Sequence, residues 1–373
     1  MMLTFLFLLY QYINAKMISQ KFNFYNDRPI LHLSYLIDNS LATPFVNTYH
    51  SYSLIENKQI ETYNKNNLQT TKKINLETEL PVLDTKEEIM FNDIKISFKQ
   101  YILTGHSWYP DQGVGLGFKF KDEDYSFIHQ LYKKKHIELL LYAIHFHDSK
   151  NGGSVYFGGL PGDINEYNKY KGNCNADENF SSWGCNVTHI KINNINITMN
   201  NYSIFHSTFY GLFYSDTLFK VLSDALSEQI NDHTCGVYNE GKTVKTFMMC
   251  DRNFIHNSNI TFEITFNDMI VSLPIAKLFE KSASKDRSSS LIYNNPSIYY
   301  SKYDIIFGGH FFKLFNYTVF DYDNKKIGLY SDSISIQMTN THSVKGIKIW
   351  YIVTSVILLL FISYMIILIE VNK

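Results

Sequence analysis

The stretch Ile305–Tyr330, IIFGGHFFKLFNYTVFDYDNKKIGLY, carries the most specific pattern in the chain. It opens on apolar residues followed by Gly308 and continues into a T-V-F-D-x-x-N-x-x-I-G run that begins at Thr318. A glycine after apolar strand residues indicates a close approach of two backbones, because only a residue without Cβ leaves that space. Gly308 therefore indicates a strand that ends where another segment of backbone lies against it.

Most of the chain outside this stretch has the pattern of an all-β protein. Short alternating runs of apolar and polar residues are separated by Gly, Asn and Asp turns. In Ile260–Leu273 the alternation is followed by an Asn-Asp turn and a second apolar run, which predicts a β-hairpin with one buried face. Helical spacing occurs only locally, at Ser126–Ile137 and Ser215–Ile230.

The composition is that of a folded protein with room for two cores. Of the 373 residues, 45% are hydrophobic and 16% are aromatic, which is enough to fill two core-bearing units. The formal net charge is -1, and the lysines are scattered rather than gathered in a stripe. The composition argues against an intrinsically disordered chain and against nucleic-acid binding.

Apolar segments near both ends predict a secreted and membrane-anchored chain. Met1–Ala15 is a short apolar run that ends in a small residue, typical of a cleaved signal peptide. Ile349–Ile369 is an uncharged run of 21 residues, close to the ~20 that a helix needs to span a bilayer. We expect a single-pass type I membrane protein in the secretory pathway, with a luminal or extracellular ectodomain and Glu370–Lys373 in the cytosol.

The segment 336–348 would then be a juxtamembrane stalk. An alternative to the span is a lipid anchor, with the tail removed after a small residue such as Ser333 or Ser343.

Four cysteines occur, as two close pairs, Cys174 with Cys185 and Cys235 with Cys250. Three connectivities are possible, and the local pairs, which close short loops in an oxidising compartment, are the expected disulfides. The absence of any C-x-x-C spacing argues against zinc. N-x-S/T sequons, which agree with the secretory route, occur at Asn179, Asn186, Asn196, Asn201, Asn259 and Asn316.

The stretch Ile305–Tyr330 resembles the closing signature of the pepsin-like aspartic proteases, the eukaryotic aspartyl proteases. Gly152–Pro161, GGSVYFGGLP, resembles the strand and turn that end that family's first lobe, and Gly113–Phe118, GVGLGF, resembles the turn beneath its first active-site loop. The resemblance implies an all-β, bilobed fold with a few short helices. In it, loops closed by Gly115 and Gly308 would each present an aspartate at a shared cleft.

In that family two carboxylates share one proton, so that one acts as general base on a water while the other donates to the scissile carbonyl. The resemblance places the first loop at Leu36–Val46, LIDNSLATPFV, with Asp38 at the first dyad position and Phe45 in the aromatic-Val pair that follows. Asn and Ser replace the Thr and Gly that follow the aspartate in the family's D-T-G-S motif.

The second loop is expected at Phe205–Phe209, FHSTF, with His206 in place of the second aspartate. In an alternative register Asp216 and Thr217 begin the motif, but Leu218 then replaces its glycine. The competing interpretation of Asp216 is a helix N-cap. Loss of the second carboxylate predicts an impaired enzyme.

Two further patterns bear on the site. The family's substrate-covering flap carries a Tyr-Gly pair, and Thr70–Leu80, TTKKINLETEL, contains neither residue. His145 and His147 lie two apart on an expected strand, but a metal site would need a third ligand. We expect no metal and no cofactor.

The expected domains are an N-terminal lobe at residues 16–165 and a C-terminal lobe at residues 166–335. The expected function is that of a pseudopeptidase, a membrane-tethered homologue of aspartic-type endopeptidases that binds a peptide or protein ligand in the cleft between the lobes. An active endopeptidase that pairs Asp38 with a partner such as Asp216 is the alternative. A surface adhesion or structural protein is a second alternative.

Overall fold

The computed structural model describes residues 16–23, 29, 31–37, 40–48, 53–56, 71–75, 79–103, 113–118, 125–147, 152–162, 164, 170–176, 182–209, 211–229, 235–240, 245–281, 286–294 and 305–339. The chain divides after Gln337 into two compact units, and the second contributes only Met338 and Thr339 to these residues. Within the described ranges, no helix is long and apolar enough to cross a membrane. The predicted signal, Met1–Ala15, and the predicted span, Ile349–Ile369, both lie outside them.

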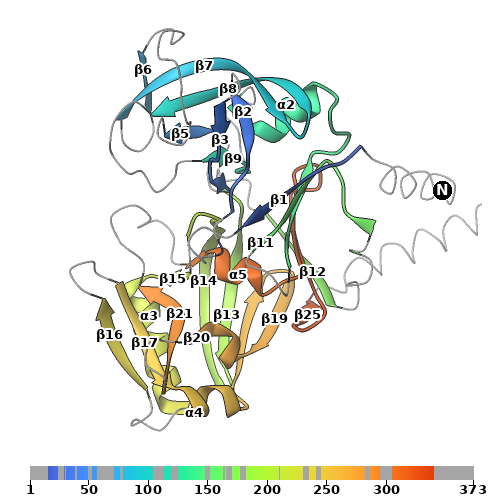
Figure 1. Cartoon of the computed structure of the whole chain (residues 1–373). Helices are drawn as coiled ribbons and strands as arrows, with labels where there is room; N and C mark the ends of the chain where they lie inside the picture. Colours follow the sequence, from blue (N-terminus) through green and yellow to red (C-terminus); the bar gives the residue numbers. More distant parts are fainter. Residues whose placement is uncertain are drawn as a thin grey trace, which may run out of the picture. The chain divides into compact units, whose positions relative to one another are not determined.

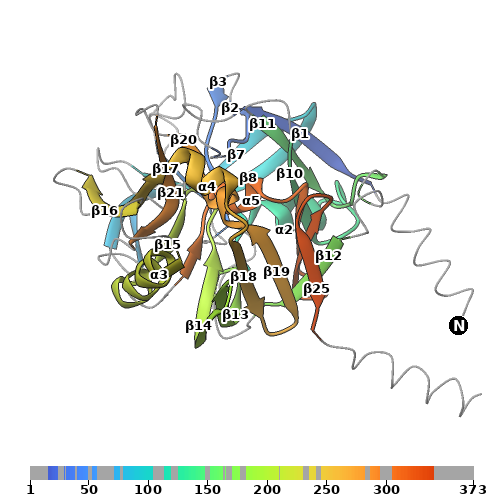
Figure 2. The ribbon, with the colours of Figure 1, turned by 90° about the horizontal axis from the view of Figure 1, so that it is seen from below.

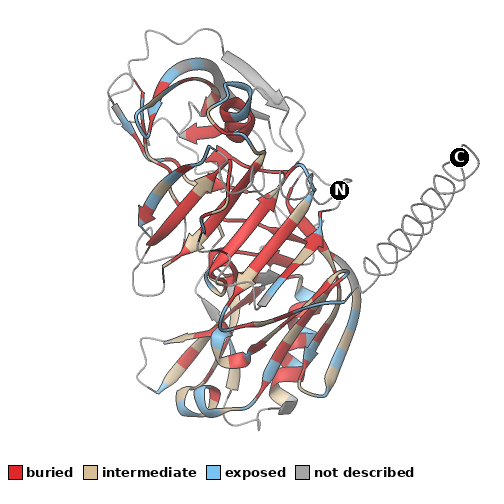
Figure 3. Cartoon of the chain, turned by 90° about the vertical axis from the view of Figure 1, so that its right-hand side faces the viewer, coloured by how far each residue is buried: buried red, intermediate tan, exposed pale blue. Residues whose placement is uncertain are grey.

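A six-stranded antiparallel sheet combines strands from both halves of the chain (Figures 1 and 2). Its order is β1 (Ile18–Asn23), β11 (Gly152–Phe157), β10 (Leu141–Phe146), β23 (Tyr317–Asp321), β24 (Lys326–Ser331) and β12 (Tyr170–Asn175). Residues along β10, β11 and β23 are almost all buried, as the red colour of Figure 3 marks, which explains their near-continuous apolar sequences. The T-V-F-D run of the closing stretch is thus the strand β23 at the centre of this sheet.

A second sheet belongs to the N-terminal half. Its strands are β3 (Ser40–Ala42), β2 (Tyr35–Ile37), β7 (Glu79–Phe91), β8 (Ile94–Leu103) and β5 (Leu54–Glu56), with β6 (Thr71–Asn75) paired to β7. The helix α2 (Phe127–Lys133) packs on this sheet through the ring of Phe127 and hydrogen bonds to it through Gln130. Gln130 accepts from the backbone N–H of Lys99 at 2.8 Å and donates to its carbonyl at 3.2 Å. The predicted helix at 126–137 is shorter because Lys135 takes a positive φ of 59°.

The C-terminal half forms an eleven-stranded sheet. Its path is β16 (Cys235–Glu240), β17 (Lys245–Asp251), β21 (Arg287–Asn294), β15 (Leu212–Tyr214), β22 (Ile305–Phe307), β14 (Ile195–Phe205), β13 (Gly184–Ile192), β18 (Thr261–Phe266), β19 (Met269–Pro274) and β25 (Ser335–Met338), with β20 (Phe279–Lys281) paired to β21. The helical elements are α3 (Asp216–Gln229), α4 (Arg252–Asn257), the 3-10 turn η5 (Ile275–Leu278) and α5 (Gly309–Lys313). The predicted hairpin in Ile260–Leu273 is confirmed as β18 and β19.

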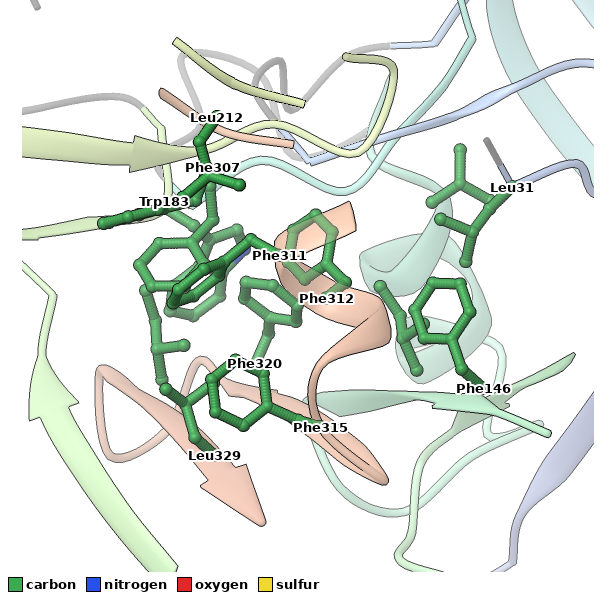
Figure 4. Close-up of a cluster of buried hydrophobic side chains, with 14 of the residues drawn as sticks. Leu31, Phe146, Trp183, Leu212, Phe307, Phe311, Phe312, Phe315, Phe320 and Leu329 are labelled. Carbon is green, nitrogen blue, oxygen red and sulfur yellow. The ribbon is translucent and has the colours of Figure 1, made fainter. Parts of the chain in front are cut away.

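Two disulfides join these elements as predicted. Cys174–Cys185 links β12 of the six-stranded sheet to β13 of the eleven-stranded sheet, and Cys235–Cys250 links the neighbouring strands β16 and β17. The largest buried side chain, Trp183, lies in an aromatic cluster with Phe307, Phe312 and Phe320 (Figure 4). The fold is therefore mostly β-sheet with a few short helices, as the sequence indicates.

Candidate functional site

Two parallel strand pairs, one in each half of the chain, form the scaffold of the site. The short strand β4 (Val46–Asn47) pairs with β9 (Val114–Gly115), so that Asn47 lies opposite Gly115. In the other half β14 pairs with β22, and Phe205 lies opposite Phe307. Both pairs bring an apolar-Gly segment against the end of a strand, which is the arrangement that the glycines predicted.

Gly308 shows why that position has no side chain. A Cβ there would lie 2.3 Å from the carbonyl oxygen of Gly211 and 2.7 Å from that of Phe209, closer than real Cβ contacts. The backbone N–H of Gly308 donates to the same Gly211 carbonyl at 2.9 Å. A substitution would therefore push the two segments apart.

Thr48 and Ser207 join the two halves by reciprocal hydrogen bonds. The N–H of Thr48 donates to Ser207 Oγ at 3.1 Å, and the N–H of Ser207 donates to Thr48 Oγ1 at 2.9 Å. Thr48 Oγ1 donates to the carbonyl of Phe205 at 2.6 Å, and Ser207 Oγ donates to the carbonyl of Val46. Each loop thus gives the other the same two contacts, and both hydroxyl residues are fully buried.

This reciprocity makes the residues before the two hydroxyls equivalent. Asn47 precedes Thr48, and His206 precedes Ser207. Both are fully buried, and the backbone N–H of His206 donates to the carbonyl of Phe307 at 2.9 Å. Asn47 and His206 therefore hold matching places at the centre of the site.

Asp38, the predicted first acidic residue, lies outside the described residues. The residues on either side of the gap, Ile37 and Ser40, pair with each other in the β2–β3 ladder, whereas the segment that meets Ser207 is Val46–Thr48. The geometry thus favours Asn47, rather than Asp38, for the first half of the candidate site. A signal was present, because the apolar pair Leu54-Ile55 follows Asn47 at the same spacing at which Phe45-Val46 follows Asp38.

Asp216 and Thr217, the residues of the alternative register, lie at the start of α3. Asp216 and Thr217 are exposed residues in the first turn of α3, and Ser207 rather than Thr217 contacts Thr48. His206, by contrast, lies in the site with its Nδ1 3.0 Å from Thr208 Oγ1 and its ring 4.6 Å from that of Phe209.

A cluster of aromatic donors holds the first loop in place. The backbone N–H of Leu116 donates to the carbonyl of Asn47 at 2.7 Å. The carbonyl of Leu116 in turn accepts from Trp183 Nε1 at 2.8 Å, from the hydroxyl of Tyr322 at 2.8 Å and from that of Tyr142 at 3.1 Å. Burial raises the pKa of both tyrosines well above the ordinary value, so both remain donors. The position of Asn47 is thereby tied to the six-stranded sheet and to β13.

The predicted histidine pair packs against neighbouring aromatic and hydroxyl side chains. The rings of His145 and His147 lie 4.7 Å apart, His145 packs on Tyr317 at 4.3 Å, and His147 Nε2 lies 3.2 Å from Ser154 Oγ. No group of three or more His, Cys, Asp or Glu side chains there is arranged to hold a metal ion.

We expect the Thr48–Ser207 contacts to contribute cooperatively to stability. Thr48→Val and Ser207→Ala should each lower the free energy of unfolding by about 1–3 kcal/mol, because each leaves buried partners unsatisfied. The double variant should lose less than the sum, since the first change already breaks the shared contacts. Urea unfolding of residues 16–337 measures this, with the exposed Thr217→Val as control. Strictly additive losses would show that the two hydroxyls act separately.

Comparisons with known proteins agree with this architecture. The family model "Eukaryotic aspartyl protease" matches residues 84–331. The aspartic proteinase from Irpex lacteus superposes with a TM-score of 0.65 at 15% identity over 84% of this chain and 97% of its own. Conglutin gamma, a basic 7S globulin from lupine seeds, gives 0.62 at 11% identity over 86% and 96%, and basic 7S globulin from soybean gives 0.63 at 11% over the same shares. No curated protein matches the sequence.

Proposed function

Because the chain belongs to the eukaryotic aspartyl protease family, we propose that it binds a peptide or protein segment in the cleft of that fold and does not cleave it. The observation that carries the proposal is the identity of the two residues placed by the Thr48–Ser207 hydrogen bonds. In this proposal Asn47 and His206 take the places of the two aspartates of the family's D-T-G motifs, because each precedes the hydroxyl residue that bonds across the two halves.

This pair lacks the chemistry of the family's reaction. Two close carboxylates share a proton because both cannot ionise together, which supplies one general base and one neutral acid. The carboxamide of Asn47 does not titrate and cannot take a proton from water. The imidazole of His206 can accept a proton, but the Asn47 position supplies a carboxamide instead of a second carboxylic acid.

The framework around the pair is nevertheless retained. The loops are joined by the reciprocal hydrogen bonds, and Gly308 keeps its close backbone contact. The β6–β7 hairpin occupies the part of the sequence where the family has its flap, without the flap's Tyr-Gly pair. Two of the similar structures are named as seed globulins rather than proteinases, which fits use of this fold for something other than proteolysis. A retained scaffold without acid chemistry supports binding.

The proposal includes a membrane tether. Met1–Ala15 would direct the chain into the secretory pathway, and Ile349–Ile369 would hold the ectodomain at a membrane, on its luminal or extracellular side. The two disulfides support an oxidising compartment, because such bonds are rare in the reducing cytosol.

A proteolysis assay on residues 16–337 tests the proposal. Between about pH 3 and pH 6, where this family's acid pair works, the wild type should show no cleavage that a pepstatin-type inhibitor blocks. A variant with Asn47→Asp, His206→Asp and Thr208→Gly should gain weak, inhibitor-sensitive activity, limited by the missing flap tyrosine. Wild-type cleavage that disappears in Asp38→Asn would overturn the assignment, and its loss in Asp216→Asn would establish the other register.

Selection of peptides that bind residues 16–337 tests the second half of the proposal. Enriched peptides should lose their binding to Asn47→Arg, because the larger charged side chain occupies the centre of the site. They should still bind Thr217→Arg, a change at an exposed residue of α3. Unchanged binding to Asn47→Arg would place the binding surface outside the cleft.

A further inference from the structure

The sequons that the structure describes differ in their surroundings, and the strand β14 places one of them, Asn196, far from the candidate site. Asn196 is the second residue of β14, and His206 follows its last residue. At ~3.3 Å per residue, about 30 Å of strand separates the two. A modification of Asn196 would therefore lie far from the Asn47–His206 pair.

A second sequon lies at the same end of the sheet. Asn196 pairs with Lys191 on β13, which pairs in turn with Glu263 on β18. At the turn that joins β13 to β14, Asn193 Oδ1 accepts from the N–H of Thr261 at 2.9 Å. Thr261 is the hydroxyl residue of the Asn259 sequon, so both sequons belong to one end of these strands.

Both of these sequons are accessible to solvent. Asn196 and Asn259 are exposed, and so are their hydroxyl residues, Thr198 and Thr261. An N-linked oligosaccharide is bulky and hydrophilic, so it is compatible with the fold only where the asparagine side chain reaches solvent.

The Asn316 sequon is the opposite case. Asn316 is 6% exposed and Thr318 is 1% exposed. The Oδ1 of Asn316 accepts from the backbone N–H of Asp332 at 3.1 Å, and its own N–H donates to the carbonyl of Tyr330 at 2.9 Å. A sugar on this side chain would have to displace the packing around β23 and β24.

We propose that this end of the eleven-stranded sheet is a glycan-bearing surface, with N-linked oligosaccharides on Asn196 and Asn259 and none on Asn316. The modification transfers the oligosaccharide from a lipid-linked diphosphate donor of the secretory pathway. A bond forms between the asparagine Nδ2 and the anomeric carbon, the bond from that carbon to the lipid diphosphate breaks, and one amide proton is released. The glycans lie away from the cleft and leave it open to a peptide.

The test expresses the full chain in human secretory cells, once with its own leader and once with a heterologous signal peptide before residue 16. Peptide mapping after enzymatic deglycosylation in heavy-oxygen water marks each occupied asparagine as a labelled aspartate. We expect label at Asn196 and Asn259 and none at Asn316 in the folded, exported protein. Asn196→Gln and Asn259→Gln should each lower the apparent mass on a gel by the mass of one glycan. Thr198→Ser, which keeps the sequon, should not remove the glycan.

This inference rests on one part of the proposed function, the entry of the chain into the secretory pathway. The experiment distinguishes failure of that entry from failure of the inference. If only the chain with the native leader failed to enter the secretory pathway, the predicted signal peptide would be contradicted. The chain with the heterologous signal peptide would still show which asparagines are glycosylated. Label at Asn316 in folded protein, or no label at Asn196 and Asn259 after entry, would overturn the inference.

Discussion

Trp183→Ala is expected to lower the free energy of unfolding of residues 16–337 by about 3–5 kcal/mol, the range for truncating a large buried aromatic residue. Trp183 is fully buried, with its ring 4.6 Å from that of Phe118 and 4.8 Å from that of Tyr322. Its Nε1 donates to the carbonyl of Leu116. Alanine would leave a cavity and remove a hydrogen bond at once, and denaturant unfolding measures the loss.

Two controls separate these contributions. Trp183→Phe keeps an aromatic ring but loses the hydrogen bond to Leu116, and should cost less than the alanine variant. Tyr132→Ala removes a ring that is 41% exposed and should stay within about 0.5 kcal/mol of wild type. If Trp183→Ala cost no more than Tyr132→Ala, the aromatic cluster would not be a centre of stability.

The second expected result is a loss of stability in acid through His310. Burial, with a smaller contribution from Lys313, lowers the pKa of His310 to about 3. Because the folded pKa lies below the unfolded value of about 6.5, the unfolded chain takes up the proton first. The contribution of His310 to the free energy of unfolding is complete above about pH 6.5 and is lost as the pH falls towards about 3. We expect a decrease of the order of 3 kcal/mol between pH 7 and pH 4.

Burial and the nearby Lys313 lower the pKa of His310, whereas nearby carboxylates oppose that shift. His310 lines a cavity of about 360 Å³ that is also lined by Lys277, Lys313 and Asp332. Glu280 Oε2 lies 3.9 Å from His310 Nε2 and would favour the charged form, but its side chain is 38% exposed and solvent screens it.

His310→Gln should flatten the pH dependence of stability, measured by denaturant unfolding at pH 7 and pH 4. The control His256→Gln changes an exposed histidine at the end of α4 and should leave the profile as in wild type. A His310→Gln profile as steep as that of wild type would assign the acid sensitivity to other groups.

The elements that could be predicted from the sequence are those whose determinants are local. The hairpin in Ile260–Leu273 is specified by alternation and a turn, and the two disulfides by short spacing. The close backbone contact at Gly308 could be predicted, because a glycine at the end of an apolar strand often marks such a contact. The C-terminal end of α2 could not be predicted from the sequence. The lysines after Lys133 continue the helical pattern, but a positive φ at Lys135 interrupts the helix.

For the first half of the candidate site, the spacing in the sequence is ambiguous. Asp38 and Asn47 are each followed by an apolar pair at the same distance, and the presence of a carboxylate favoured Asp38. What distinguishes them is contact across nearly 160 residues of sequence, between Thr48 and Ser207. Such a contact leaves no local pattern. His206 is suggested by the sequence alone, because a recognisable strand precedes it and a recognisable helix follows it.

The pairing of β10 with β23 has a consequence for how the chain is made. Tyr317 lies opposite His145 and Asp321 opposite Leu141, so the two strands are separated by roughly 170–180 residues of sequence. At about 5–20 residues per second of synthesis, β10 waits on the order of ten seconds or longer before its partner exists. β10 pairs with β11 on one side and with β23 on the other. Until β23 has been synthesised, the β23 side of β10 is an unpaired strand edge that can pair with other nascent chains. This edge stays unpaired until synthesis has passed Asp321, the last residue of β23.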